Sequence, residues 1–239
     1  MSPRLTAALL ITAAVLTNAA FTVLGTVFNY PDILAEPVDD ILTAFRAHQS
    51  VVVAWFTVMA VASALFIPIA IGVGRLSTHR AMRVAVPVGI AAGVVQVVGL
   101  LRWPLLVPGF ARDAASSDPA VAAAARHAFE LAHRILGTVI GETLGYLLTA
   151  AWTLLVLAAV GSWIARRWFT VLGAVAAVLI LGGVLTPLHL PGVDFGNFIG
   201  YVLWSVWLII FAILILRHAR SPGEAFEPVR SAAPRTATS

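Results

Sequence analysis

Residues 135–165 read ILGTVIGETLGYLLTAAWTLLVLAAVGSWIA, and Glu142 is the only charged residue among them. A helix needs about 20 apolar residues to cross a hydrocarbon layer of about 30 Å, so this run is long enough to span one. Neither this run nor 171–185 shows the alternation of apolar and polar residues that a transmembrane β-strand requires. The stretch therefore predicts a transmembrane helix and argues against a membrane barrel.

Five further runs without charge or histidine occupy residues 5–31, 49–74, 84–101, 168–188 and 195–216. Of the 239 residues, 60% are hydrophobic and 11% are charged, and the mean hydropathy is +0.96. Soluble domains carry charge on about a quarter of their residues, so the chain belongs in a bilayer. We predict an all-α, polytopic transmembrane bundle spanning 1–217, with three helical hairpins and six helices at about 5–28, 50–74, 84–103, 135–160, 168–186 and 196–217.

The segment before the fourth helix starts with Ser117-Asp118-Pro119. Asp caps free backbone amides and Pro suits the first helical position, so a helix is expected to begin there. A helix over 119–160 would be about 63 Å long, twice the hydrocarbon core, so residues 119–134 are predicted to form an amphipathic outer arm. Residues 218–239 have too little apolar content to fold and are predicted to be a disordered cytoplasmic tail.

All 15 basic residues are arginines, and the predicted connections share them unevenly. If the N-terminus lies inside, ten arginines are cytoplasmic, whereas five arginines and eight of the 11 acidic residues lie on the other side or at its border. Cytoplasmic loops carry an excess of basic residues, so both termini are expected to be cytoplasmic. The net charge of +4 then reflects topology, and no nucleic-acid binding is expected.

Glu142 is the one ionisable residue deep within a predicted span, eight residues or about 12 Å beyond Arg134. Ionisable residues at such depth generally face a cavity or a partner. We expect Glu142 to be a neutral hydrogen-bond donor or the anion of a pair with Arg102 or Arg134. A buried ion pair that merely joins two helices is the structural alternative to a ligand site.

The fourth and sixth predicted helices share a pattern at a constant offset of 55 residues. Its members are Gly141, Gly145, Tyr146, Leu148 and Trp152, which recur as Gly196, Gly200, Tyr201, Leu203 and Trp207. Both helices are predicted to run inward, so the repeat is parallel rather than inverted. A duplicated hairpin would explain the pattern, as would two helices that each use spaced glycines for close packing, and we favour packing.

Histidines gather on the predicted outer side, and imidazole can ligate zinc or haem iron. His48, His133 and His189 are therefore candidates for a metal site. The chain lacks a His-Glu-x-x-His motif, a phosphate-binding loop and a nucleophile elbow, so catalysis has little support. The absence of cysteine excludes disulfides and thiolate chemistry, and no particular cofactor is predicted.

Several motifs together resemble a known family. They are NYPDIL at 29–34, LRWP at 101–104, LAHRILG at 131–137 and GETLGYLLTAAWT at 141–153. They are similar to bacterial domain-of-unknown-function family 4386 (DUF4386), and the similarity extends from the first predicted helix to the sixth. The resemblance implies a small multi-pass protein of the bacterial inner membrane, with no activity attached. It adds weight to Asp32, Arg102, His133 and Glu142 as the polar members of the motifs.

Our leading hypothesis is an outward-opening polar pocket between the second, third, fourth and sixth helices that binds a small molecule or a lipid headgroup without chemistry. The candidate ligand-binding residues are Glu142, Arg102, Arg134, His133, Tyr146, Asn197, Tyr201, His48 and Asp32. A proton-coupled transporter of a small solute is one alternative, because Glu142 could change protonation. A metal- or haem-dependent membrane enzyme is the other. The lipid bilayer is the only partner that the sequence itself implies.

Overall fold

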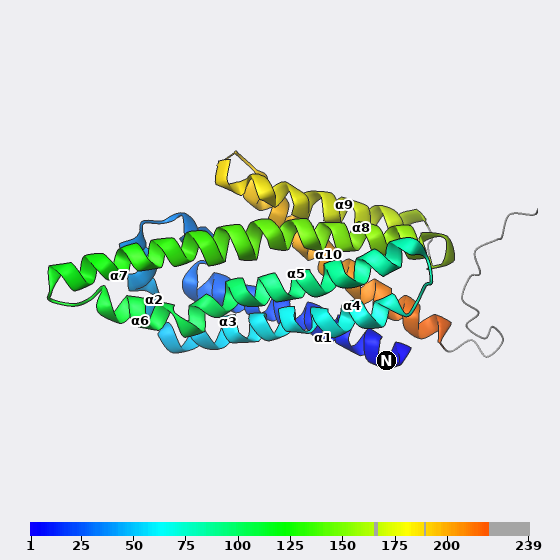
Figure 1. Ribbon diagram of the computed structural model, residues 1–239, viewed down its shortest axis with the longest axis horizontal. Coiled ribbons are helices and arrows are strands. Elements are labelled where there is room, and N and C mark those ends of the chain that lie inside the picture. Colours follow the sequence, from blue (N-terminus) through cyan, green and yellow to red (C-terminus); the bar gives the residue numbers. More distant parts are fainter. Residues whose placement is uncertain (165–166, 189, 220–239) are drawn as a thin grey trace, which may run out of the picture.

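The computed structural model describes residues 1–164, 167–188 and 190–219, and these residues form helices without any strand (Figure 1). Within this part of the chain, six helical stretches are long and apolar enough to cross a membrane. They are Pro3–Phe28, Gln49–Gly74, Arg80–Asp113, Pro119–Val160, Arg167–Leu188 and Val193–His218. The predicted all-α transmembrane bundle is confirmed. All but the first two residues of the predicted tail lie outside the described residues.

Most of these stretches are divided into shorter elements. The first consists of α1 (Pro3–Phe28) and is followed by η1 (Asp32–Ala35) and α2 (Val38–Ala47). The second comprises α3 (Gln49–Ala64) and α4 (Phe66–Gly74), and the third comprises α5 (Arg80–Leu105) and α6 (Val107–Asp113). The fourth comprises α7 (Pro119–Ala132), η2 (His133–Leu144) and α8 (Gly145–Ile164). The last two are α9 (Arg167–Gly182) with η3 (Gly183–Leu188), and α10 (Val193–His218).

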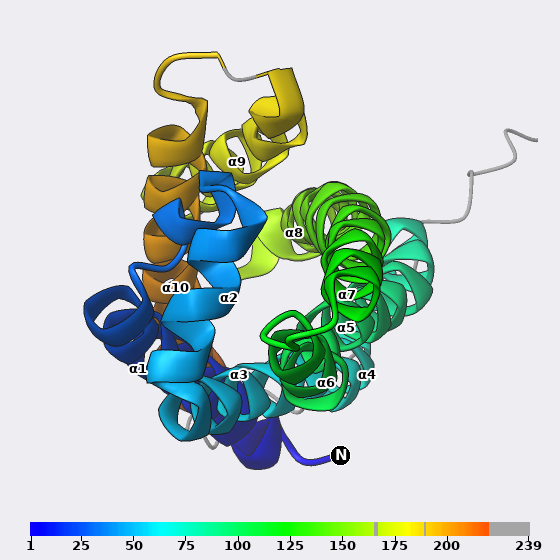
Figure 2. The same cartoon turned by 90° about the vertical axis from the view of Figure 1, so that its left-hand side faces the viewer.

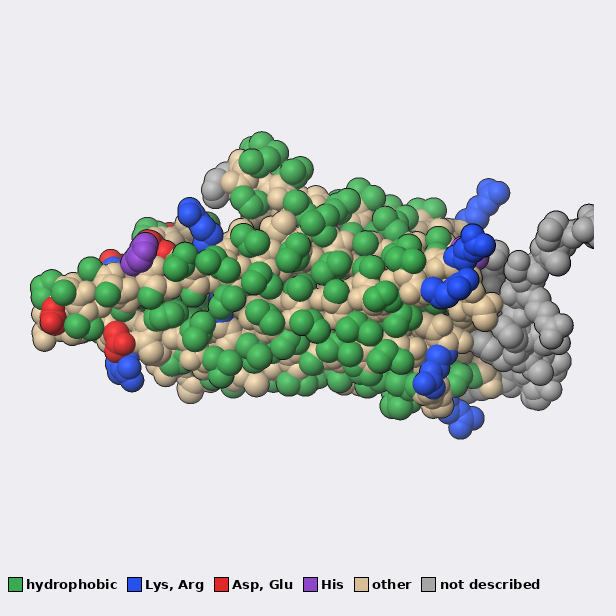
Figure 3. All heavy atoms as spheres, viewed as in Figure 1, with side chains coloured by type: hydrophobic (Ala, Val, Ile, Leu, Met, Phe, Trp, Pro, Cys, Tyr) green, Lys and Arg blue, Asp and Glu red, His purple; other side chains and the backbone are tan. Residues whose placement is uncertain are grey.

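Successive spans are neighbours in pairs, because α1 packs on α3, α5 on α8 and α9 on α10. Seen end-on, α9 lies at the outside of the bundle, next to α8 and α10 (Figure 2). The elements α2, α6 and α7 gather at one end, which we call the capped end, and the N-terminus lies at the other, the terminal end (Figure 1). On the face in Figure 3, hydrophobic side chains cover the middle of the molecule, acidic ones lie at the capped end and several basic ones lie at the terminal end.

The fourth stretch departs from the α-helix that was predicted. Asp118 caps α7 as expected, accepting a hydrogen bond from the amide of Ala120 at 2.8 Å. From His133 to Leu144, however, the backbone forms a π-helix. Gly137 and Gly141 lie in this wider segment, where Arg102 and Gly99 of α5 approach closely. Such segments are rare and occur often at functional sites.

A dense aromatic core fills the terminal half of the bundle. Trp152 and Trp207 are fully buried with ring centroids 6.1 Å apart, and Phe66 meets Trp152 at 4.6 Å. Glycines of the preceding helices make room for both indoles. A Cβ at Gly89 would lie 2.5 Å from the Trp152 ring, and one at Gly173 would lie 2.6 Å from Trp207. Small residues therefore allow these helices to approach, as membrane packing requires.

The 55-residue repeat also serves packing at most of its positions. Its tyrosines, Tyr146 and Tyr201, have ring centroids 5.9 Å apart, so large side chains of the two helices meet. Gly200 faces the α9 backbone, where an added Cβ would lie 2.8 Å from the nitrogen of Ile180. Gly196 breaks the pattern, because no described atom of another element lies within 4 Å of its Cβ position. These contacts support the packing interpretation of the repeat.

A second aromatic cluster lies toward the capped end. Trp103 is fully buried and stacks on Phe56 with centroids 4.7 Å apart. Polar contacts also join the elements of the capped end to one another. Nε of Arg126 in α7 donates to Asp39 of α2 at 2.6 Å, and Arg46 of α2 donates to the carbonyl of Ala111 in α6 at 3.0 Å. The polar contacts thus join α2, α6 and α7 to one another, and the aromatic contacts of Phe45 and Phe129 with Trp103 join this end to α5.

Candidate functional site

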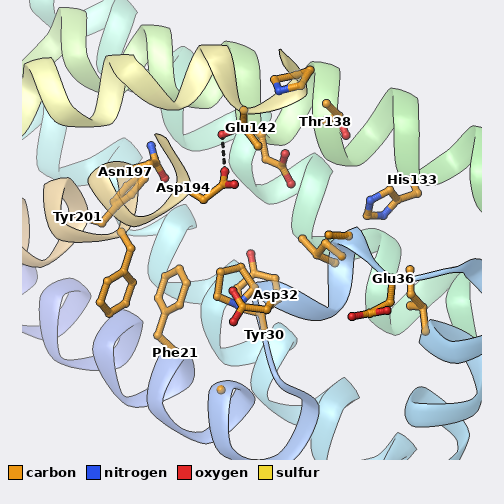
Figure 4. Close-up of a pocket in the computed structure, with 18 of the residues that line it drawn as sticks. Phe21, Tyr30, Asp32, Glu36, His133, Thr138, Glu142, Asp194, Asn197 and Tyr201 are labelled. Carbon is orange, nitrogen blue, oxygen red and sulfur yellow. Dashed lines mark hydrogen bonds between the residues drawn. The ribbon is translucent and has the colours of Figure 1, made fainter. Parts of the chain in front are cut away.

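The capped half contains a cavity of about 1670 Å³, which we call the large cavity (Figure 4). Its wall is built from α1, the segment 30–41, α7, η2, the start of α8, η3 and α10. A small cavity of about 100 Å³ adjoins it and is lined in part by α3 and α5. The sequence placed the pocket between the second, third, fourth and sixth helices. The structure instead uses the first helix in the wall of the large cavity, and only the small cavity reaches the second and third.

Glu142 lines both cavities. Its side chain projects from η2 toward the interior of the large cavity (Figure 4). Within the described part of the chain, its carboxylate forms neither a hydrogen bond nor an ion pair. The predicted ion pair with Arg102 or Arg134 is therefore not formed. An acidic group inside a membrane bundle, open to a cavity and without a partner, is the most unusual feature of the site.

Arg102 is held by other contacts, which explains why it does not pair with Glu142. Its side chain is buried, and Nη1 donates to the carbonyl of Gly99 at 2.6 Å. The guanidinium lies 5.3 Å from the ring centroid of Trp103 and packs against Gly137, where a Cβ would come within 2.8 Å of Nη2. Arg102 lines only the small cavity, and its Nε has no hydrogen-bond partner among the described atoms.

Asp194 is a second carboxylate in the large cavity. It lies in the first turn of α10, accepts a hydrogen bond from Oγ1 of Thr186 at 2.8 Å, and extends toward Glu142 (Figure 4). The two acidic groups are near enough to interact electrostatically, and Arg102 acts on Glu142 more strongly and with the opposite sign. Sequence reasoning assigned Asp194 only to the outer charge count. Its position just before an apolar run resembles an ordinary helix start, which hides its relation to Glu142.

Tyrosines form much of the wall near Glu142. Tyr30, Tyr146 and Tyr201 all line the large cavity, and Tyr30 packs on Phe21 with ring centroids 5.5 Å apart. Burial raises the pKa of Tyr30 to about 12, the negative charge of Glu142 adds to the effect, and Arg102 opposes it. The phenol of Tyr30 is therefore protonated at neutral pH and can donate a hydrogen bond.

A polar network continues from the small cavity into the terminal half. Nε2 of Gln96 donates to Oγ1 of Thr149 at 2.9 Å, and Ser63 reaches Oε1 of Gln96 at 3.5 Å. Farther along α8, Oγ1 of Thr153 accepts from Nε1 of Trp204 at 2.9 Å. The network links α3, α5, α8 and α10. Gln96 thus contacts two other helices, α3 and α8.

The other candidate residues divide into two groups. Arg134, His133, Asn197 and Asp32 line the large cavity with Glu142, Tyr146 and Tyr201. His48, the C-cap of α2, lies in the wall of neither cavity, and His189 falls outside the described residues. No group of three or more side chains suited to bind a metal occurs in the described ranges. Seven of the nine ligand-binding candidates thus line the large cavity, whereas Arg102 lines only the small cavity.

Comparison with known families gives one match. A family model described as "Domain of unknown function (DUF4386)" matches residues 5–217, nearly the whole chain. The matched range contains every residue that lines the two cavities. Neither a curated protein nor a solved structure matches the chain. The description of the family carries no activity, so function has to be argued from the site itself.

Proposed function

The chain belongs to the DUF4386 family, and we propose that this multi-pass membrane protein binds a small molecule or a lipid headgroup in the large cavity around Glu142. Ligand sites usually enclose about 300 to 1,000 Å³, so a cavity of about 1670 Å³ has room for a whole ligand. No group transfer is required by this proposal. The protein would act as a binding or sensing protein.

The unpaired carboxylate of Glu142 carries the proposal. Keeping an ionisable side chain inside a membrane bundle is unfavourable unless a partner compensates it. The structural alternative, a buried ion pair that joins two helices, loses its support because Arg102 bonds to Gly99 instead. A ligand that enters the large cavity would supply the missing partner. The convergence of Tyr146, Tyr201 and Asn197 on the same space supports this interpretation.

Retained molecules test the proposal most simply. Wild-type protein, Glu142→Gln and the control Asp40→Asn are purified in a mild detergent, and small molecules are extracted and measured by mass spectrometry. Asp40 is exposed on α2 and outside both cavity walls, so its variant controls for loss of an acidic group. We expect a compound that copurifies with wild type and Asp40→Asn but falls at least fivefold in Glu142→Gln. Equal amounts in all three, together with lower stability of Glu142→Gln, would make the carboxylate merely structural.

We further propose that the capped end faces away from the cytoplasm of a bacterial inner membrane, with both termini cytoplasmic. The excess of arginine at the predicted inner connections supports this orientation. Because the chain has no cysteine, single cysteines can report it directly. Ser117→Cys, in the exposed α6–α7 connection, should react with a membrane-impermeant maleimide on intact cells, and Thr78→Cys should react only after lysis. The reverse pattern would invert the topology.

A proton-coupled transporter is the second candidate, and the polar network of Gln96, Thr149 and Thr153 favours it. A transported solute must reach the opposite face, and this network extends part of the way from Glu142. Proteoliposomes with an imposed pH gradient test it. Proton movement that depends on added solute and is lost in Glu142→Gln would favour transport. Its absence, with binding intact, would leave a binding protein.

A further inference from the structure

Resting on the proposed function, we infer the chemical class of the ligand: an organic cation with an apolar body, whose positive charge lies between Glu142 and Asp194. Four features of the cavity favour such a ligand: the charge of its wall, the absence of an ion pair at Glu142 among the described residues, two hydroxyls of α1 and the aromatic rings. An arginine-centred pocket would instead bind a phosphate or a carboxylate.

The wall of the large cavity is strongly unbalanced in charge. Only one arginine, Arg134, belongs to it among the described residues, and two histidines accompany it. The carboxylates of the same wall are Asp32, Glu36, Glu130, Glu142 and Asp194. Arg102, the one buried guanidinium nearby, lines the small cavity instead. A cavity with such a lining attracts cations and repels anions.

In the described part of the chain, neither Glu142 nor Asp194 forms an ion pair with a cationic side chain. Arg102 acts on Glu142 only electrostatically, from the small cavity. The hydrogen bond from Thr186 to Asp194 supplies a dipole but no charge. Like charges in a shielded site repel strongly, because little water remains to screen them. Both side chains extend into the same part of the cavity (Figure 4). A positive group placed there would be attracted by both.

Two hydroxyls of α1, those of Thr22 and Thr26, present acceptors rather than donors. Thr22 donates its hydroxyl to the carbonyl of Asn18, and Thr26 donates to Thr22, each at 2.8 Å. Both threonines line the cavity, so only the lone pairs of their oxygens are available to a ligand. An anion would find no donor in these two hydroxyls. Ammonium groups, which only donate, would find acceptors.

Aromatic and apolar side chains complete the site. Tyr30, Tyr146 and Tyr201 surround the region of Glu142, and the faces of such rings attract cations, including quaternary ones. Phe195 and Phe198 line the cavity with 70% and 43% of their surface exposed. A bare metal ion would leave this apolar surface and most of the volume unused. An organic cation with an apolar body would use both.

Tetraphenylphosphonium and tetraphenylborate provide a matched test, because they share size and shape and differ in the sign of their charge. Binding is measured by equilibrium dialysis on full-length protein in an uncharged detergent, with detergent alone subtracted. We expect tetraphenylphosphonium to bind at least tenfold more tightly than tetraphenylborate. Glu142→Gln and Asp194→Asn should each weaken it at least fivefold, while Asp40→Asn should leave it within twofold of wild type. Circular dichroism establishes that each variant is folded.

Three results would overturn the inference: tetraphenylborate binding as tightly as tetraphenylphosphonium, no saturable binding of tetraphenylphosphonium, or unchanged affinity in both cavity variants. Not all of these results would contradict the proposed function. If tetraphenylborate binds and its affinity changes in Glu142→Gln, the cavity is still a ligand site and only the ligand class is wrong. Proposed binding around Glu142 fails only if the retained molecules are also the same in wild type and Glu142→Gln.

Discussion

The two halves of the bundle differ in how completely side chains fill the space between the helices. In the terminal half, Trp152 and Trp207 fill the space between helices, and Gly89 and Gly173 leave room for the two indoles. In the capped half, the helices leave a large cavity lined by acidic groups and tyrosines. Packing between helices is what stabilises a bundle in lipid, where the hydrophobic effect does not drive helix association. The contrast suggests that the terminal half supplies stability and the capped half is available for binding.

The largest loss of stability is expected when a large buried side chain is removed from the terminal half. Trp152→Ala should lower the free energy of unfolding by about 3 to 5 kcal/mol, because it leaves a cavity in a tightly packed core. Phe21→Ala, in the wall of the large cavity, should cost less than half as much, since Phe21 already borders empty space. Thermal unfolding in detergent measures both. Equal losses would contradict the division between the two halves.

Filling the space beside the indole should have the next largest effect. Gly89→Val places atoms against Trp152, where even a Cβ would lie 2.5 Å from the ring, and overpacking of this kind costs about 1 to 3 kcal/mol. Gly109→Ala is the control, because no described atom outside its own helix turn lies within 4 Å of that Cβ. It should leave stability unchanged or raise it slightly. A tolerated Gly89→Val would mean that the terminal half is loosely packed.

Glu142→Gln tests whether the capped half serves binding rather than stability. Removing a charge that forms no ion pair with any described residue and faces Asp194 should raise the free energy of unfolding by about 1 kcal/mol in the absence of ligand. The same variant should bind tetraphenylphosphonium at least fivefold more weakly. A site that gains stability and loses binding is functional. Lower stability with unchanged binding would instead point to a structural role for the carboxylate.

Tyr30 gives a prediction about pH. Because its pKa is raised to about 12, folding favours the neutral phenol, and the resulting stabilisation is complete below about pH 10 and is lost as the pH rises through 12. Wild type should therefore lose stability relative to Tyr30→Phe across this interval, by about 3 kcal/mol at most. Tyrosinate absorbance during alkaline titration locates the ionisation. A normal value near 10 would show that Tyr30 is open to water.

The smallest effect is expected at the surface of the cap. The contact of Arg126 with Asp39 is short but partly exposed, and such ion pairs contribute from about 0 to 1 kcal/mol. Arg126→Gln should therefore shift the unfolding midpoint by only a few degrees, and added salt should remove the difference. A large shift of the unfolding midpoint would mean that the capped end contributes substantially to stability, contrary to the division proposed above.

The sequence predicted the spans better than the site, for a physical reason. A helix in lipid must satisfy its own backbone hydrogen bonds and bury a long apolar surface, so uncharged runs such as 135–165 identify a crossing without any partner. Glu142 could be identified in the same way, as a charge where charges are costly. The conditions that fix a cavity wall are different. They depend on which helices lie side by side, and sequence spacing does not determine that.

Particular residues illustrate what was missed. Arg102 was expected to reach Glu142, but Gly137 leaves space beside η2 in which the guanidinium packs, and Gly99 offers its carbonyl. The π-helical backbone of 133–144 also changes the angle between residues that an α-helical wheel assumes. Asp194 joins Glu142 only because α10 and η2 border the same space. Such a meeting of distant segments is a property of the tertiary fold.

The most direct measurement uses tetraphenylarsonium, whose arsenic atom scatters anomalously, on crystals of the full-length protein. We expect an anomalous peak inside the large cavity, within about 6 Å of both the Glu142 and the Asp194 carboxylates, the range over which such charges and rings hold a cation. The peak should disappear in crystals of Glu142→Gln. An arsenic peak confined to the lipid-facing surface, or one that persists unchanged in the variant, would contradict it.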